Sequence, residues 1–180
     1  MFTKNAYILQ SLNMLAEDKI VTIDIRPLNW DGSSRYNYSP NGSLNNYRVT
    51  NIYKALNTVK TDLYTYREGV LFGTGDTPAS LDDYKLAGDL ITNIVASINR
   101  TYSYSEAQQS LKAVYTITNN NAEEITIREV ALHVLFYSTT SGGTNGCVID
   151  RTVLDTPVTI PAGGVGQVEY TITFNLPTST

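Results

Sequence analysis

Alternation of apolar and polar residues over the carboxyl-terminal part of the chain restricts its fold more than any other feature. The alternation runs through residues 110–118, 125–138, 147–154 and 158–176, and it is interrupted by "NNNAEE", "TTSGGTNG" and "PAGG". A period of two places successive side chains on opposite faces of a strand, and segments rich in Asn, Gly and Pro form the turns between strands. Several short strands of this kind are typical of an antiparallel β-sandwich, immunoglobulin-like or jelly-roll-like. We therefore predict a mainly β protein of this class.

The turn "PAGG" has the residue types that can close a sandwich. Pro161 cannot continue the hydrogen-bond ladder of a strand, and Gly163 and Gly164 permit a positive φ. In the strand that follows, the alternation predicts one apolar face that consists of Val168, Tyr170, Ile172 and Phe174.

The amino-terminal part is more varied. The spacing of its apolar residues predicts a short amphipathic helix within 5–18, and alternation predicts a strand over 19–27. Residues 48–56 and 69–72 resemble strands, with a helix as the alternative over 50–62. Residues 81–99 fit helix or strand, and their β-branched content favours strand. Since no repeat or linker divides the chain, we predict one domain over 1–180, in which 1–69 elaborate a sandwich core of 70–180.

Residues 29–47 form a loop rich in Gly, Ser, Asn and Tyr, which is either a flexible surface loop or a contact surface. The chain has 13 Tyr against four Phe, and tyrosine combines a large contact area with a polar tip. The residues expected to contact a partner protein or a glycan are Trp30, Tyr36, Tyr38 and Tyr47.

The stretch "VLFGTGDTPASLDDYKL" resembles a phosphate-binding loop only at first sight. A dinucleotide fingerprint needs a third glycine where this chain has Pro78, and a phosphate-binding loop of the Walker type needs a Gly-Lys-Ser/Thr ending. The structural interpretation is favoured. Gly73 and Gly75 give a tight turn, Asp76 binds nearby backbone N–H groups, and Ser80 caps a short turn.

Carboxylates cluster in and after this stretch, at Asp76, Asp82, Asp83 and Asp89, but their spacing matches no EF-hand. We expect no bound metal and no cofactor.

Catalytic chemistry is not expected either. His133 is the only histidine, it lies within an expected strand, and no nucleophile elbow accompanies it. The lone Cys147 lies in a different expected strand. Glu123, Glu124 and Glu129 could pair as in a glycosidase, but a turn and an outward-facing strand position suggest ordinary solvated surface. We therefore predict a protein that is not an enzyme.

Charge and composition exclude other classes. The net charge is −4 and no run of Lys or Arg exceeds two residues, so nucleic acid is not an expected partner. The first residues lack the continuous apolar run of a signal peptide or a membrane span. A single cysteine rules out an intramolecular disulfide and agrees with synthesis in a reducing cytoplasm.

Three segments, "FGTGDTPASLDDYKLAGDL", "YTITNNNAEEITIREVALH" and "VIDRTVLDTPVTIPAGGVGQVEYTITFN", resemble a set of tailed-bacteriophage virion structural proteins. The pattern runs GTGDT…DYxL, then ITIRE, then RTVLDxPVTIPAGG…YTIxFN, and it covers residues 70–92 and 112–176. The resemblance implies a structural subunit of the virion, made in the cytoplasm of the bacterial host. Such a subunit would decorate the capsid or lie at the neck or in the tail, as a homo-oligomer that contacts capsid, portal or tail proteins. The alternative is a phage-borne module that binds a glycan or receptor through the loop at 29–47.

Overall fold

A computed structural model describes the chain in six parts, residues 1–2, 47–49, 55–62, 68–105, 108–138 and 143–175. The predicted helix within 5–18, the predicted strand over 19–27 and most of the loop at 29–47 lie outside these parts. The described strands are β1 (Tyr47–Val49), β2 (Gly69–Gly73), β3 (Ile94–Tyr104), β4 (Gln108–Asn119), β5 (Ile125–Ser138), β6 (Gly143–Ile160) and β7 (Val165–Asn175).

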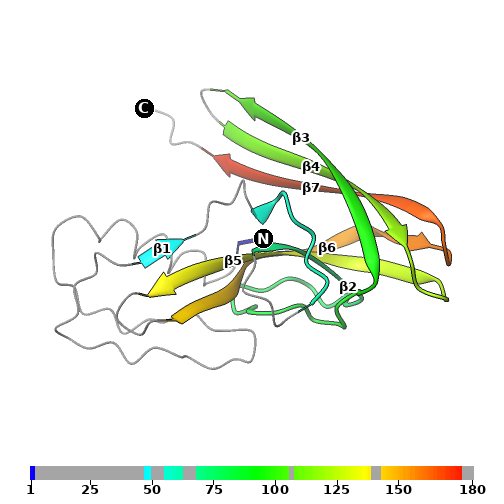
Figure 1. The fold of residues 1–180 in the computed structure, drawn as a ribbon. Helices are drawn as coiled ribbons and strands as arrows, with labels where there is room; N and C mark the ends of the chain where they lie inside the picture. Colours follow the sequence, from blue (N-terminus) through cyan, green and yellow to red (C-terminus); the bar gives the residue numbers. More distant parts are fainter. Residues whose placement is uncertain (3–46, 50–54, 63–67, 106–107, 139–142, 176–180) are drawn as a thin grey trace, which may run out of the picture.

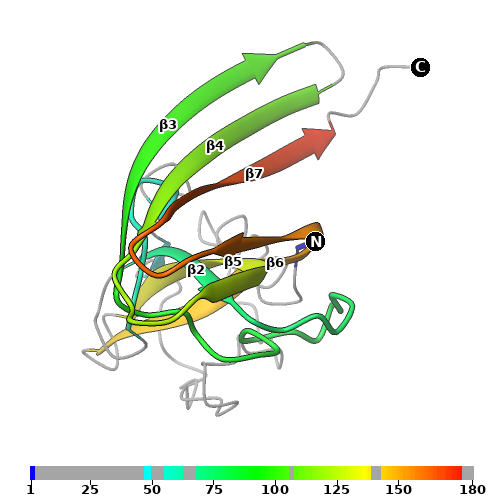
Figure 2. The ribbon, with the colours of Figure 1, turned by 90° about the vertical axis from the view of Figure 1, so that its right-hand side faces the viewer.

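The strands form two antiparallel sheets, which confirms the predicted sandwich. In the first sheet β5 pairs with β1, β2 and β6, and in the second the order is β3-β4-β7. The sheets lie close together where the turns at 119–124 and 161–164 connect them, and they diverge toward the opposite end (Figures 1 and 2). The far end of the second sheet therefore stands away from the first sheet, as a projecting end (Figure 2).

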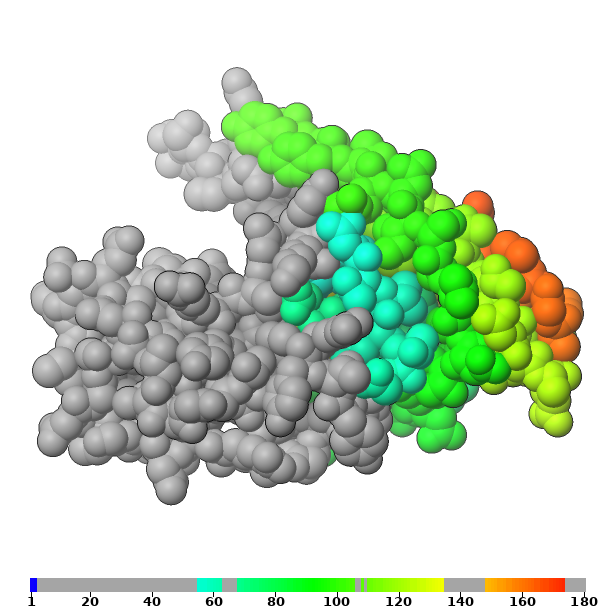
Figure 3. Space-filling view, viewed as in Figure 1, coloured from blue at the N-terminus to red at the C-terminus, as the bar shows by residue number. Residues whose placement is uncertain are grey.

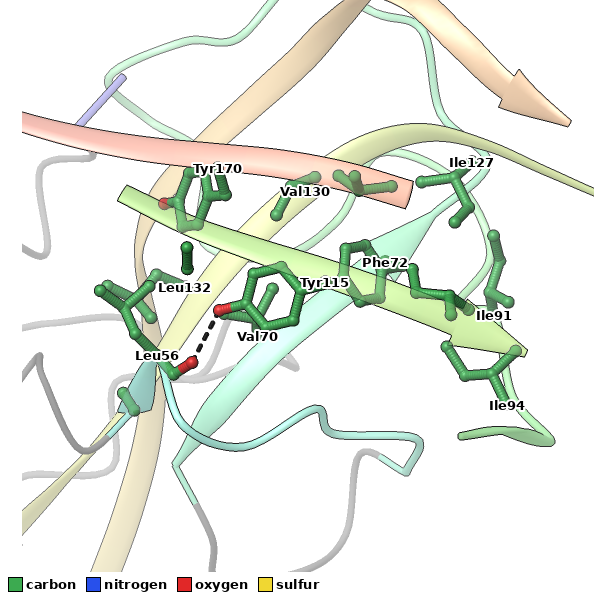
Figure 4. Packing of buried hydrophobic residues seen from close by; sticks show 14 of the residues in the cluster. Leu56, Val70, Phe72, Ile91, Ile94, Tyr115, Ile127, Val130, Leu132 and Tyr170 are labelled. Atoms are coloured by element: carbon green, nitrogen blue, oxygen red, sulfur yellow. Dashed lines mark hydrogen bonds between the residues drawn. The ribbon is translucent and has the colours of Figure 1, made fainter. Parts of the chain in front are cut away.

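The core fills the space between the sheets. Inward-facing residues of β4, β5 and β7 are buried there, as the alternation predicts. The rings of Phe72 and Tyr115 meet edge to face with their centroids 5.4 Å apart. The Tyr115 hydroxyl donates a hydrogen bond of 2.8 Å to the Leu56 carbonyl, so its polar tip is satisfied inside the core (Figure 4). Burial raises the pKa of this tyrosine, since the charged phenolate would lack water there.

Asn119 joins the two turns that close the sandwich. Its side-chain amide is buried and donates to the carbonyls of Glu123 (2.8 Å), Ile160 (3.0 Å) and Pro161 (3.1 Å). The same side chain accepts a bond from the Asn121 backbone N–H. This one residue therefore ties the end of β4 to the start of the next strand and to the end of β6.

The turn after β6 follows the prediction in two of its three residues. The strand ends at Ile160, immediately before Pro161, and Gly163 has a φ of 68°. Gly164 is not among the described glycines with positive φ, so of the two glycines only Gly163 uses the freedom that glycine permits at this turn. Its N–H donates to the Pro161 carbonyl, which a negative φ permits.

Two further strand predictions need correction or completion. Residues 147–154 and 158–160 are not two strands, because β6 runs unbroken through residues 155–157. Of the ambiguous stretch 81–99, only the part from Ile94 onward is regular, and it is strand, as favoured. Residues 81–93 form turns and irregular structure, apart from an isolated bridge between Gly73 and Leu90.

Candidate functional site

The segment 74–91, which holds the glycine-rich stretch, covers the outer face of the first sheet. Leu86 of this segment is buried in a small apolar cluster with three residues of that sheet, Leu71, Ala131 and Val148, and Leu90 packs against it. The segment thus lies on the face that does not look toward the second sheet. A second, minor core holds it there.

A fully buried carboxylate holds the segment at its polar positions. Glu129 of β5 accepts backbone hydrogen bonds from Gly75 (3.0 Å), Ala87 (3.0 Å) and Gly88 (2.8 Å). Each of its two oxygens has two donors, because the fourth bond comes from Arg151 Nε at 2.6 Å. A buried charge is tolerated only when it is paired and hydrogen-bonded, and here both conditions hold.

Arg151 of β6 completes the ion cluster. Its side chain is fully buried, and its Nη1 contacts the Asp83 carboxylate at 2.8 Å. The same guanidinium donates to the carbonyls of Thr77 (2.7 Å) and Pro78 (3.5 Å). Burial by itself would lower the pKa of Arg151, but the hydrogen bonds to Glu129 and Asp83 outweigh it and raise the pKa. The Arg151 cation and the carboxylates of Glu129 and Asp83 thus link β5 and β6 to the beginning and the end of the segment 74–91.

A β-bulge places Arg151 on the outer face. The register between β5 and β6 shifts between Leu132 and His133, which pair with Asp150 and Val148. Ile149 is the extra residue, and it points into the main core. Because the bulge resets the alternation, Val148 and Arg151 both face outward although they are three residues apart.

Glycine is required where the segment crosses itself. A Cβ on Gly75 would overlap the backbone nitrogen of Gly88 and lie 2.5 Å from Glu129 Oε1. A Cβ on Gly73 would lie 2.6 Å from the same oxygen. Both glycines predicted to be structural therefore make room for the Glu129 carboxylate and not for a phosphate.

Two expectations for this region are wrong and one is confirmed. Glu129 is not solvated surface, since it is fully buried. The backbone N–H groups of Gly75, Ala87 and Gly88 are bound by Glu129, whereas Asp76 is exposed. The short turn at Ser80 is confirmed: its hydroxyl accepts from the Asp82 N–H at 3.2 Å, and its own N–H donates to Asp83.

A second polar cluster lies on the core side of β6. The Asp150 carboxylate is 3.0 Å from the Met1 ammonium and accepts a 2.5 Å hydrogen bond from the Tyr170 hydroxyl. Burial and the neighbouring carboxylate raise the pKa of Tyr170. Met1 also donates to the Arg151 carbonyl at 2.8 Å, and Phe2 forms an antiparallel bridge with Asp150, so the first two residues pair with the edge of β6.

The predicted contact residues are only partly within the described structure. Trp30, Tyr36 and Tyr38 lie outside it. Tyr47 lies within β1, where its backbone pairs with Ser138 at one end of β5. His133 and Cys147, the candidates for nucleophilic catalysis, lie on adjacent strands. They are not opposite each other in the register, since Cys147 pairs with Val134 and His133 with Val148. His133 is buried.

An exposed aromatic surface lies elsewhere, on the projecting end of the second sheet. Along β3 the side chains on the face toward the core pass from the buried Ile94 to Tyr102 and Tyr104, which are 56% and 63% exposed. Tyr102 is registered beside Leu111 of β4, which is registered beside Ile172 of β7. The green atoms around β3 form the upper rim of the molecule in Figure 3. Alternation within "RTYSYS" could have indicated this strand, but the exposure of its tyrosines depends on how far the sheets diverge.

Comparisons with protein-family models, with curated proteins and with solved structures found no match. Within the described parts of the chain no helix is long and apolar enough to cross a membrane. The same residues contain no group of His, Cys, Asp and Glu side chains arranged to hold a metal ion.

Proposed function

We propose that this chain is a structural subunit of a tailed-phage particle, as a capsid decoration or as a neck or tail protein. It would act without catalysis, by assembling with copies of itself and with capsid, portal or tail proteins in the virion. The proposal rests on the resemblance of three sequence segments to virion structural proteins, together with what those segments do in the fold.

The observation that carries the proposal is the convergence of these segments on one buried ion cluster. The first segment supplies Asp83 and the N–H groups bound by the carboxylate, the second supplies Glu129, and the third supplies Arg151. Every charged group in the cluster is paired with a group of opposite charge. The backbone at Gly73 and Gly75 lies so close to the Glu129 carboxylate that no space is left there for a ligand. The residues of the three segments therefore serve to stabilise the fold, which suits a protein whose role is to remain folded in an assembly.

A tyrosine-rich chain with a projecting sheet supports the same proposal. Exposed aromatic side chains on a regular sheet are typical of protein–protein contact surfaces. Tyr102 and Tyr104 supply such a surface within the described residues.

The test is whether the protein is part of the particle. Particles purified through a density gradient should contain the chain by mass spectrometry at a fixed ratio to the major capsid protein, and electron microscopy should place it. Its absence from purified particles would overturn the proposal. Saturable binding of the isolated protein to host cells, lost in Trp30→Ala and Tyr38→Ala variants, would favour the glycan- or receptor-binding module instead.

A further inference from the structure

The outer edge of β3 is a strand edge with no partner among the described strands. β3 is the terminal strand of the order β3-β4-β7, and its eleven residues pair with β4 in unbroken register. The strand contains no proline and no bulge, and Arg100 is its only charged residue. Proteins usually protect an edge of this kind with proline, lysine or a bulge, because unpaired edges recruit other strands.

The hydrogen-bond pattern of the β3–β4 pair shows which residues face the free edge. Ser105 and Gln108 exchange both backbone hydrogen bonds, at 2.8 and 3.3 Å. In an antiparallel pair such hydrogen-bonded positions alternate with positions whose N–H and C=O groups point away from the partner. Counting back along the register from Ser105, Thr101 is bonded to β4, whereas Arg100 and Tyr102 direct their backbone groups outward. The outward set is Ile94, Ala96, Ile98, Arg100, Tyr102 and Tyr104.

We propose that a second copy of this chain pairs with this edge, antiparallel and about a two-fold axis at Thr101, so that two three-stranded sheets become one continuous six-stranded sheet. This inference deepens the proposed function, on which it rests, by naming the contact through which copies associate. A two-fold contact uses the same surface on both copies, so the surface must be complementary to itself.

The choice of a second copy follows from the side chains that this axis brings together. Each Tyr102 lies opposite Arg100 of the other copy, where the ring can pack on the aliphatic part of the arginine side chain. On the same face Ile98 lies opposite Tyr104, an aromatic–β-branched pair. On the opposite, exposed face Thr101 meets its own copy, a favourable Thr–Thr pair.

Neighbouring registers are less favourable. An axis at Arg100 would place two guanidinium groups directly opposite each other, which is destabilising. An axis at Asn99 would place the charged Arg100 opposite the apolar Ile98 and Tyr102 opposite the small Ala96, which are less complementary pairs. The axis at Thr101 also uses only residues 98–104, the part of β3 on the projecting end (Figure 1).

Single cysteines test both the contact and its register, in a Cys147→Ala background that removes the native thiol. Thr101 would occupy a non-hydrogen-bonded pair with its own copy, where Cα atoms are about 4.5 Å apart and a disulfide can form. We expect Thr101→Cys to give a disulfide-linked dimer on mild oxidation. The matched control Asn99→Cys should not, since the two Asn99 positions would be about 13 Å apart along the strands. The double variant Asn99→Cys/Ser103→Cys should cross-link again. Cross-linking of Asn99→Cys as readily as Thr101→Cys, or none in Thr101→Cys, would overturn the proposal.

A second pair of variants tests the backbone contact without cysteine. Tyr102→Pro removes an outward N–H and no β3–β4 hydrogen bond, whereas Tyr102→Ala removes the side chain and keeps the N–H. By sedimentation, the dimer dissociation constant should rise about tenfold more for the proline variant, since two edge hydrogen bonds are lost per dimer. Equal effects in two folded variants, or a wild-type chain that is monomeric at every concentration, would overturn the pairing. The proposed function would fail separately, by absence of the chain from purified particles.

Discussion

Replacing Glu129 by Gln should destabilise the protein far more than the loss of one charge at the surface. The carboxylate has two donors at each oxygen, with Gly75 and Gly88 at Oε1 and Ala87 and Arg151 at Oε2. Whichever way a glutamine amide turns, its NH₂ group faces two donors and cannot accept from them. The buried guanidinium also loses one of its two carboxylate partners. Breaking a buried ion pair costs about 3–5 kcal/mol, and we expect Glu129→Gln to fall in that range.

The assay is urea unfolding at constant pH, with Glu169→Gln as the matched control. Lys112 and Glu169 also form an ion pair, 2.5 Å apart, but their side chains are 42% and 54% exposed. An exposed pair contributes about 0–1 kcal/mol, so Glu169→Gln should hardly change the free energy of unfolding. For a chain of this length the core variant should lower the melting temperature by roughly 6–20 °C.

A double-mutant cycle separates the pair from its surroundings. Arg151→Met alone leaves the Glu129 carboxylate buried with its three backbone donors, and we expect a loss of similar size. If the two groups interact directly, the double variant should cost less than the two single losses added together, by about 1–3 kcal/mol. Additive losses, or a Glu129→Gln variant as stable as Glu169→Gln, would refute the reasoning that this ion cluster holds the segment 74–91.

Three further changes probe other parts of the fold. Gly75→Ala should cost about 1–3 kcal/mol in the same urea titration, since its Cβ would overlap the backbone of Gly88, and a loss below about 0.5 kcal/mol would mean that the segment shifts freely. Asn119→Ala should cost about 2–4 kcal/mol because three carbonyls lose their donor, whereas the neighbouring exposed Asn120→Ala should change little. Tyr115 keeps its proton in the folded state and loses it in the unfolded state above about pH 10, so above that pH the wild type should lose about 1.4 kcal/mol per pH unit relative to Tyr115→Phe. Parallel stability–pH curves for these two proteins would contradict the raised pKa.

The sequence alone determined the class of fold and most of its strands. Residues 125–138 were predicted as one strand and are β5, and the predicted inward residues Val168, Tyr170 and Ile172 of β7 are buried. Pro161 and Gly163 mark the turn between sheets. These features are local. A strand with one buried face must alternate apolar and polar residues, and a turn needs residues that end the hydrogen-bond ladder or adopt a positive φ.

The site depended on the tertiary structure. The sequence pattern predicts an outward, solvated position for Glu129, and the residue does face outward, but the segment 74–91 covers that face. The bulge at Ile149 then reverses the alternation and brings Arg151 to the same side. Neither fact is visible in local spacing, because the partners of Glu129 lie 22 to 54 residues away along the chain. Whether a charged side chain lies in water or in the core is decided by what packs over it, and only the folded chain supplies that cover.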